Sequence, residues 1–520
     1  MNPAPTFAGA SSVIPARYAR RFSVVPVGLD DGVLRVAHAE DAPPELLDEL
    51  ALLLGLEVTG EPVAARPLAD LLQRTYGVGA DAIDSLTAGA AAAGLDADAE
   101  AAGARSHAAV REAVDDAADD ASIVAVVNEL LVRAEREGAT DIHVEPLEDR
   151  VRVRFRIDGM LLEIPVPDGL VRYHQVVVSR IKVMANLDIA ERRLPQDGRI
   201  KATVRGVQHE YRVSILPTQF GETVDIRVLT NASILTGLDG LGMWPDEQAY
   251  IRRVLEAPYG VVLVTGPTGS GKTTSLYSFL NLLNETSRKI ITIEDPIEYH
   301  LDGITQVQVH PRIGLSFAAG LRSMLRHDPD VMMVGEIRDH ETAETVIRVA
   351  LTGHLVFSTV HTNDAPSTPA RLLDMGVEPY LLASSVRAII AQRLVRRVCP
   401  ACAGPDTSPA ARRLAAVAAG DGDAPGFLTG AGCDRCHGTG FSGRTAIFEI
   451  LPVTTAVQEL ILARAPAAAL RDEMTARGGL TLRDRGRALA ARGGTSVSEV
   501  LRVTVDDDLH GQASGAEAGA

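Results

Sequence analysis

Apolar residues recur along this chain either at alternate positions or at every third or fourth position, and the change of period separates its regions. In the first 80 residues, FSVVPVGLDDGVLRVAHAE alternates on both sides of a turn and predicts two strands. The segments PPELLDELALLLG and PLADLLQRTYG have the spacing of amphipathic helices. Residues 1–80 are therefore expected to form a small α/β domain. Residues 81–120 are mainly Ala, Gly and Asp, which predicts a flexible acidic linker.

A second domain is expected over residues 121–235. It begins with the helical pattern SIVAVVNELLVRAEREG and continues with the alternating segments RVRVRFRIDG, RIKATVRGVQHEYRVSIL and ETVDIRVLT. In these predicted strands, Arg faces one side and Val, Ile or Phe faces the other. Two interpretations stay open: a sheet with one solvated face, or a sheet whose arginines meet an anion.

Strand and helix patterns alternate over residues 236–395, after a short hinge at residues 237–242. This alternation is typical of a mostly parallel sheet with helices on both faces. A cysteine-bearing insert is expected over residues 396–445 and a helical region over residues 446–505. The acidic, Gly- and Ala-rich tail, residues 506–520, is expected to be disordered.

The most specific chemical motif lies in this third domain. GPTGSGKT fits the P-loop pattern G-x-x-x-x-G-K-[ST], follows the apolar run GVVLVT and precedes apolar residues at helical spacing. Backbone N–H groups of such a loop surround phosphate oxygens, and the N-terminus of the helix adds positive potential. We expect Lys272 to reach the β and γ phosphates and Thr273 to ligate Mg²⁺. The expected nucleotide-binding residues are Gly266, Pro267, Thr268, Gly269, Ser270, Gly271, Lys272, Thr273 and Thr274.

Two glutamates at the ends of predicted strands are the candidate carboxylates for nucleotide hydrolysis. KIITIE ends in Glu294, and VMMVGE ends in Glu336, with Gly335 where a Walker B strand usually has its Mg²⁺-binding Asp. Hydrolysis needs Mg²⁺ to neutralise charge and a carboxylate to orient the attacking water. We assign Glu294 as the water-orienting base and Glu336 as the Mg²⁺-side ligand acting through water. The exchanged assignment remains an alternative.

A further segment, GHLVFSTVHTND, predicts a strand between two histidines. His361 and Thr362 lie at its end, where a polar group is in place to sense the γ phosphate. His361 is therefore a candidate catalytic residue. For both His354 and His361 a purely structural role is the alternative, because a lone histidine at a strand end is usually structural.

The chain has four cysteines, in two pairs of C-x-x-C spacing: Cys399, Cys402, Cys433 and Cys436. Paired knuckles of this kind predict a closed, tetrahedral and structural Cys₄ zinc site. His437 is in place to substitute for one thiolate, although four cysteines suffice. Free thiols or disulfides are the alternative, and a cytoplasmic chain disfavours disulfides.

Composition and charge restrict the class of protein. At 520 residues, with 46% apolar and 23% charged residues, the chain is expected to be a soluble protein of several domains. Its net charge of −17 argues against broad nucleic-acid binding, which requires a cationic surface. There is no signal-peptide pattern and no run near the roughly 18 apolar residues of a membrane span. A cytoplasmic location is expected, with membrane association only through partners.

In order, GPTGSGKT, TIEDPIEY, LRSMLRHDPDVMMVGEIRD and GHLVFSTVHTND resemble the Walker A, Asp-box, atypical Walker B and His-box segments of secretion ATPases. These are the hexameric motors of type II secretion and type IV pilus assembly. GATDIHVEP and RRLPQDGR resemble signatures of that family's second N-terminal domain, and the tetracysteine insert resembles the zinc element of its secretion and extension members.

The resemblance covers residues 120–500 and implies the fold class. This is a multidomain α/β protein with a RecA-like P-loop ATPase core, a PAS-like second N-terminal α/β domain, a small N-terminal α/β docking domain and a Cys₄ zinc insert. The cofactors implied are ATP, Mg²⁺ and Zn²⁺. The partners implied are five further copies in a homohexamer, and the inner-membrane linker and platform proteins of the secretion or pilus machine.

The resemblance also implies roles for arginines. Arg212 and Arg227 match residues that reach the nucleotide from the second N-terminal domain, and are candidate catalytic residues. Arg193 and Arg199 lie in a matching segment with a less defined role, and Arg322 and Arg326 match arginines that precede Walker B. The alternative for each is an arginine that only solvates a sheet face or helix.

The leading hypothesis is an ATP-hydrolysing cytoplasmic motor that powers pseudopilus assembly and protein export by a type II secretion system. A type IV pilus extension ATPase is the nearest alternative, and the single short N-terminal domain favours secretion. A nucleic-acid translocase is disfavoured by the acidic balance and by the absence of a basic, aromatic-interleaved stretch. A non-hydrolysing scaffold is disfavoured by the complete Walker A motif with its two glutamates.

Overall fold

The computed structural model of the chain forms two compact units, Met1–Thr230 and Asn231–Ala520. The structure describes residues 13–86 except 15, 31, 44, 81, 84 and 85, then 121–229 except 205, 237–419 and 426–504. The predicted tail and nearly all of the predicted acidic linker lie outside the described residues. None of the helices in these described ranges is long and apolar enough to cross a membrane.

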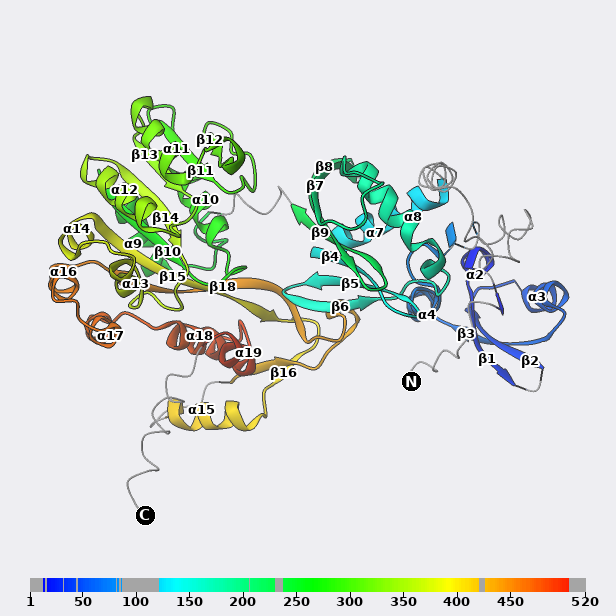
Figure 1. Cartoon of the computed structure of the whole chain (residues 1–520). Helices are drawn as coiled ribbons and strands as arrows, with labels where there is room; N and C mark the ends of the chain where they lie inside the picture. Colours follow the sequence, from blue (N-terminus) through cyan, green and yellow to red (C-terminus); the bar gives the residue numbers. More distant parts are fainter. Residues whose placement is uncertain are drawn as a thin grey trace, which may run out of the picture. The chain divides into compact units, whose positions relative to one another are not determined.

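The first unit begins with a three-stranded sheet in the order β1-β2-β3 (Figure 1). The predicted strands β1 (Val24–Asp30) and β2 (Val33–Ala39) pair antiparallel, and β3 (Glu57–Val63) pairs parallel to β2. The helices are α2 (Ala16–Phe22), α3 (Leu46–Leu54) and α4 (Ala65–Tyr76). The apolar pattern does not anticipate β3, whose Gly60 and Pro62 are tolerated because β3 is an edge strand.

The rest of this unit is a six-stranded antiparallel sheet in the order β6-β5-β4-β9-β8-β7. Alternate residues of its strands pack with two helices into one apolar core, so the intervening residues lie on the opposite face. The predicted long alternating segment is two strands that pair antiparallel, with Val204 opposite Val207. The elements are α7 (Ala121–Arg136), β4 (Ala139–Pro146), β5 (Val151–Ile157), β6 (Met160–Ile164), α8 (Leu170–Met184), β7 (Gln196–Val204), β8 (Val207–Thr218) and β9 (Gly221–Leu229).

The second unit is built on a seven-stranded sheet in the order β12-β11-β13-β14-β10-β15-β18, parallel except for the antiparallel edge strand β18. The predicted mostly parallel sheet is thus confirmed. Its elements are α9 (Pro245–Leu255), β10 (Gly260–Thr265), α10 (Lys272–Leu283), β11 (Ile290–Glu294), β12 (Thr305–Gln308), η3 (Pro311–Ile313), α11 (Phe317–Met324), η4 (Leu325–His327), β13 (Val331–Val334), α12 (His340–Leu351), β14 (Leu355–Val360), α13 (Thr368–Asp374), α14 (Pro379–Ser385), β15 (Val386–Val398) and β18 (Phe441–Pro452).

Both faces of this sheet are buried. In β10, Val261 and Leu263 belong to an apolar cluster with α11, α12 and α14, whereas Val262 and Val264 belong to another with α9 and α10. Figure 1 shows the sheet between these helices. Burial on both faces explains why the central strands are continuous apolar runs without alternation.

The chain between β15 and β18 forms the cysteine-bearing segment, and the described residues after β18 form four helices. The segment contains β16 (Ala403–Pro405), α15 (Pro409–Ala419), β17 (Leu428–Gly430) and η5 (Asp434–Cys436). The four helices are α16 (Thr455–Leu462), α17 (Ala467–Ala476), α18 (Leu482–Ala491) and α19 (Val497–Val503).

A buried ion pair joins helix α19 to strand β15 of the sheet. Arg396 of β15 donates from its backbone N and from Nη2 to the Glu499 carboxylate, at 3.0 and 2.6 Å, and its guanidinium lies 4.1 Å from the centre of the Phe441 ring. Glu499 also accepts two hydrogen bonds from Arg502. Because these charges are buried, each depends on its partner.

We expect Arg396→Met to destabilise the second unit by about 3 kcal/mol, because Glu499 would keep its burial and lose a partner. This corresponds to a fall of roughly 6–12 °C in the melting temperature of that unit. Calorimetry on the full-length protein measures it. Arg397→Met is the matched control, since the neighbouring side chain is exposed. Equal melting temperatures for the two variants would contradict the expectation.

Candidate nucleotide-binding site and cysteine cluster

The P-loop runs from the end of β10 directly into α10, as its sequence context predicts. Gly266, Gly269 and Gly271 have φ angles of 150°, 78° and 88°, which side-chain-bearing residues rarely adopt. At Gly266 space is also lacking, since an added Cβ would lie 2.6 Å from both the Gln392 carbonyl oxygen and Ser270 Oγ. The loop therefore has the compact glycine-dependent geometry of a phosphate-binding loop.

Lys272, the first residue of α10, folds back over this loop. Its Nζ donates to the carbonyl oxygens of Gly266 at 2.8 Å and Pro267 at 3.1 Å. Burial lowers the pKa of Lys272 to about 8, with Glu336 opposing and Arg393 adding to the shift. A phosphate at the loop would supply the anion that this ammonium group lacks.

The predicted acidic and histidine positions converge on the same edge of the sheet. Glu294, Glu336 and His361 lie at or just beyond the carboxyl ends of β11, β13 and β14, which are parallel to one another and to β10. The Glu294 Cα lies 3.4 Å from the position that a Cβ on Gly335 would occupy. This is the edge at which α/β sheets bind ligands.

The Glu294 carboxylate is enclosed by hydrogen-bond donors. Oε2 accepts from the Tyr277 hydroxyl, and Oε1 accepts from Thr292 Oγ1 at 2.6 Å and Gln306 Nε2 at 3.2 Å. The side chain is buried, and burial raises its pKa although the three donors oppose the shift. A raised pKa suits a general base. The predicted role of Glu294 stays a prediction.

Glu336 is more open and lies among basic side chains. Its carboxylate pairs with Arg338 Nη2 at 2.5 Å and His361 Nε2 at 3.2 Å, and its charge acts on Lys272. A carboxylate so close to the P-loop lysine is suitably placed for the Mg²⁺ side of the nucleotide. The structure thus brings together Lys272, Glu336 and His361.

The other polar residues of the His-box segment have structural contacts. Thr362 Oγ1 is bonded to the hydroxyls of Thr265 and Thr368, both at 2.7 Å, which ties the segment to the end of β10. His354 lies at the opposite end of β14, where Nδ1 is 3.2 Å from the Val349 carbonyl oxygen and 3.0 Å from Thr352 Oγ1. The structure therefore separates His354 from the site.

Arginines of the first unit form a row across its antiparallel sheet. Arg199, Arg212 and Arg227 are directly opposite one another on β7, β8 and β9, and Arg227 is opposite Asp141 on β4. Asp141 pairs with Arg227 at 3.1 Å, and Arg199 pairs with Glu210 at 3.1 Å. Like charges directly opposite each other are unfavourable, and a bound anion would relieve the repulsion.

The remaining candidate arginines are exposed and have local partners. Arg193 pairs with Glu191 at 2.8 Å, which lowers the pKa of that carboxyl to about 2. Arg322 pairs with Glu341 at 2.7 Å, and Arg326 donates to the Arg322 carbonyl oxygen at 3.2 Å. Their predicted roles at the nucleotide stay predictions.

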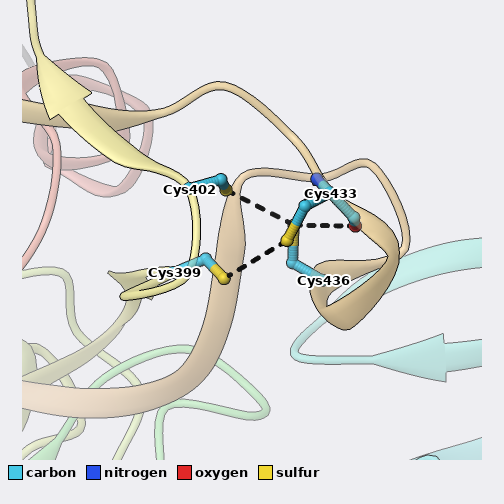
Figure 2. Close-up of side chains that lie close together, drawn as sticks. All are labelled: Cys399, Cys402, Cys433 and Cys436. Atoms are coloured by element: carbon cyan, nitrogen blue, oxygen red, sulfur yellow. Dashed lines mark hydrogen bonds between the residues drawn. The ribbon is translucent and has the colours of Figure 1, made fainter. Parts of the chain in front are cut away.

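The four cysteines converge from two turns (Figure 2), with all four sulfur atoms within 4.8 Å of one another. The distances from Sγ of Cys399 to Cys433, Cys402 to Cys436 and Cys433 to Cys436 are 3.9, 3.8 and 3.7 Å. A tetrahedral metal with four bonds of about 2.3 Å requires sulfur atoms about 3.8 Å apart. The spacing therefore fits Zn²⁺ and excludes disulfides in this conformation.

The sulfur of Cys436 has hydrogen-bond donors that favour the thiolate form, which a metal requires. Cys436 Sγ accepts the N–H groups of Cys433 and Gly440, both at 3.2 Å. Burial alone would raise its pKa, but these donors hold the pKa at about 7, below the usual thiol value. Among the described residues the metal-binding cluster contains cysteines alone, without His437.

Several residues around the P-loop and Glu294 are not anticipated by the motifs. Gln392 on β15 is buried and accepts from Ser275 Oγ at 2.8 Å, and Arg393 follows it. Tyr277 of α10 holds Glu294. Gln392 and Arg393 lie about 120 residues beyond the P-loop in a run that shows only a strand pattern, so their position depends on the pairing of β15 with β10.

Comparison with known proteins identifies the family. The family described as "Type II/IV secretion system protein" matches residues 116–502, and the MshEN domain matches residues 5–81. The type IV pilus assembly ATPase PilB of Myxococcus xanthus is 42% identical over 503 residues, covering 95% of this chain and 86% of PilB. Type II secretion system protein E of Pseudomonas aeruginosa is 48% identical over 393 residues, covering 75% of this chain and 77% of that protein.

Among solved structures, the pilus retraction motor PilT with bound ADP matches with a TM-score of 0.50 and 26% identity, covering 74% of this chain and 98% of PilT. The fold and the P-loop site define a nucleotide hydrolase of the P-loop class. The chain belongs to the family of type II/IV secretion ATPases. It hydrolyses ATP, and membership of this family implies that ATP binds together with Mg²⁺.

The lowered pKa of Lys272 makes nucleotide binding dependent on pH. Bound phosphate stabilises the ammonium form, so above about pH 8 the free protein must take up a proton to bind. We expect the affinity for ADP to fall up to tenfold per pH unit between pH 8 and 9.5. Fluorescence titration with a labelled ADP measures it. Lys272→Arg keeps its charge and serves as the control, and an affinity of the wild type that is constant over this range would contradict the assignment.

Proposed function

We propose that this chain is the hexameric, cytoplasmic motor that powers pseudopilus assembly and protein export by a type II secretion system. The observation that carries the proposal is the convergence of Lys272, Glu336 and His361 beside the P-loop of a secretion ATPase. The 48% identity of the core to a type II secretion system protein E favours export. The full-length similarity to PilB makes type IV pilus extension the alternative. Nucleic acid is not a proposed partner.

The motor is proposed to act on the membrane through inner-membrane linker and platform proteins. The PilT relative is a pilus motor by name, which supports mechanical work as the output of hydrolysis. Arg212 and Arg227, in the arginine row, are proposed to neutralise phosphate charge during hydrolysis. Their alignment on neighbouring strands supports anion binding by the pair.

Gene deletion in the source organism distinguishes the two machines. We expect loss of this chain to abolish export of secreted enzymes while surface pili remain, and we expect wild-type protein but not Lys272→Ala to restore export. Culture supernatants and pilus counts give the readouts. Lost pili with normal export would assign the chain to pilus assembly. Purified protein should hydrolyse ATP without stimulation by DNA, and strong stimulation would favour a nucleic-acid translocase.

The two glutamates are separable by the Mg²⁺ dependence of turnover. We expect Glu294→Gln to lower kcat about 100-fold or more at an unchanged Mg²⁺ requirement, because it removes the general base. We expect Glu336→Gln to raise the half-saturating Mg²⁺ concentration roughly tenfold, because it removes a group that holds the metal's water. Steady-state ATPase assays across a Mg²⁺ titration measure both.

Glu344→Gln on α12 is the matched control, because its carboxylate pairs with Arg348 on the helix surface. It should leave kcat and the Mg²⁺ requirement unchanged. The reverse pattern for the other two variants would exchange the roles of Glu294 and Glu336. Wild-type turnover in both would reject the hydrolytic mechanism assigned to this site.

The cysteine cluster is proposed to hold one structural Zn²⁺ per chain. We expect elemental analysis of the purified protein to find one zinc, and Cys433→Ser to reduce the content well below one because an all-thiolate site loses a ligand. His437→Ala is the control and should retain one zinc, because the four sulfur atoms already complete the coordination. Loss of zinc in the His437 variant, or full retention in the Cys433 variant, would contradict the Cys₄ assignment.

A further inference from the structure

Arg393 lies on β15 at the level of the P-loop. In the parallel pairing of β15 with β10, Thr265 is opposite Ala391, so Gln392 and Arg393 continue beside the residues that follow β10. The Arg393 side chain is 8% exposed. A side chain on Gly266 would bring its Cβ within 3.2 Å of Arg393 Nη1, so the guanidinium lies against the first residue of the P-loop.

The same guanidinium holds the loop that carries His361. Nη2 donates to the Asn363 carbonyl oxygen at 2.7 Å, and Nη1 donates to the Gln392 carbonyl oxygen at 3.1 Å. The planar guanidinium of Arg393 thus lies against Gly266 of the P-loop and is hydrogen-bonded to Asn363 of the His-box segment. A lysine would keep the charge but lack the fork that makes both contacts.

The charge of Arg393 has no local counterion. Among the described residues, no carboxylate lies within ion-pair distance of it, and its hydrogen-bond acceptors are neutral carbonyl and amide oxygens. The nearest acids are otherwise engaged: Asp364 pairs with Arg471 at 2.9 Å, and Glu449 accepts the N–H groups of Ala365 and Leu482. Burial lowers the pKa of Arg393 although the charges of Glu449 and Asp364 oppose the shift from beyond ion-pair distance. A buried cation without an ion-pair partner is costly, and such sites are often functional.

An arriving phosphate would change this balance. Arg393 lies close enough to Lys272 for its charge to lower the pKa of that lysine. Two positive charges therefore lie close together at a phosphate-binding loop. A bound phosphate would offset the repulsion between them. One of these charges belongs to Arg393, which also donates to the carbonyl oxygen of Asn363, two residues beyond His361.

We propose that Arg393 is a positioning residue for ATP hydrolysis, which fixes the His361 loop relative to the P-loop when phosphate is bound. The inference rests on the ATPase activity of the chain and adds a residue to its machinery. It does not require that Arg393 touch the nucleotide. The basis is its hydrogen bond to the Asn363 carbonyl oxygen, its position against Gly266 and its buried charge.

The test compares Arg393→Gln and Arg393→Lys in the full-length protein. We expect both to lower kcat on the order of tenfold to a hundredfold, because misplacement by about 1 Å has effects of this size. The dissociation constant for labelled ADP should change less than about threefold in Arg393→Lys, which keeps the positive charge near the phosphate, so a loss of kcat in that variant reports positioning. The melting temperature should stay within a few degrees of the wild type.

Arg387→Gln is the matched control. Arg387 lies near the start of the same strand, where Nε donates to the Tyr259 carbonyl oxygen at 3.2 Å, and its loss should leave kcat unchanged. A cycle with His361→Ala adds a second readout. If Arg393 acts through the His361 loop, the double variant should be no slower than the slower single variant.

Wild-type kcat in Arg393→Gln would overturn the proposal. Full rescue by Arg393→Lys would overturn the bridging role, because charge alone would then suffice. Parallel losses of kcat, ADP affinity and melting temperature would indicate a purely structural residue and would also overturn it. A wild-type protein that fails to hydrolyse ATP would instead reject the ATPase assignment, so the two failures are distinguishable.

Discussion

The close approach of the P-loop backbone to β15 at Gly266 is the constraint on which the nucleotide site depends. The carbonyl of Gln392 and the hydroxyl of Ser270 occupy the space that any side chain at position 266 would need. This contact holds the loop against the sheet and brings Arg393 beside it. Because β10 is a central strand buried on both faces, the position of the loop is fixed by the core. The packing of the core therefore holds the residues of the site in position.

The sequence predicted the parts of this site that are local in the chain. The P-loop, the strand ends at Glu294 and Glu336 and the paired cysteines follow from short motifs, and the structure places them at strand ends and turns as expected. The motifs did not predict the positions of Arg393 and Tyr277 at the site. Both positions depend on contacts between segments that are separate in the sequence: the pairing of β15 with β10 for Arg393, and the bond to Glu294 for Tyr277. In the same way β3 was missed, since an edge strand tolerates Gly60 and Pro62 and so lacks a strand pattern.

The arginine pattern shows how register adds information to alternation. The sequence indicated that arginines share one face of the second N-terminal sheet, but left open whether that face is merely solvated. Register places Arg199, Arg212 and Arg227 side by side on adjacent strands, with Asp141 the next member of the row. Aligned like charges reduce sheet stability. A solvated face gains nothing from that alignment, whereas a site for a multiply charged anion does.

The geometry of Glu294 is compatible with its predicted role in orienting water. An ionised carboxylate offers about four lone-pair positions. Thr292 and Gln306 use two on Oε1, and Tyr277 uses one on Oε2. These three bonds therefore leave one lone-pair position on Oε2 unused. The three donors also limit the rotation of the carboxylate, so a water bound there would have a defined direction. Burial favours the protonated form and the donors favour the ionised one, which leaves a base stronger than an exposed glutamate yet still held in place.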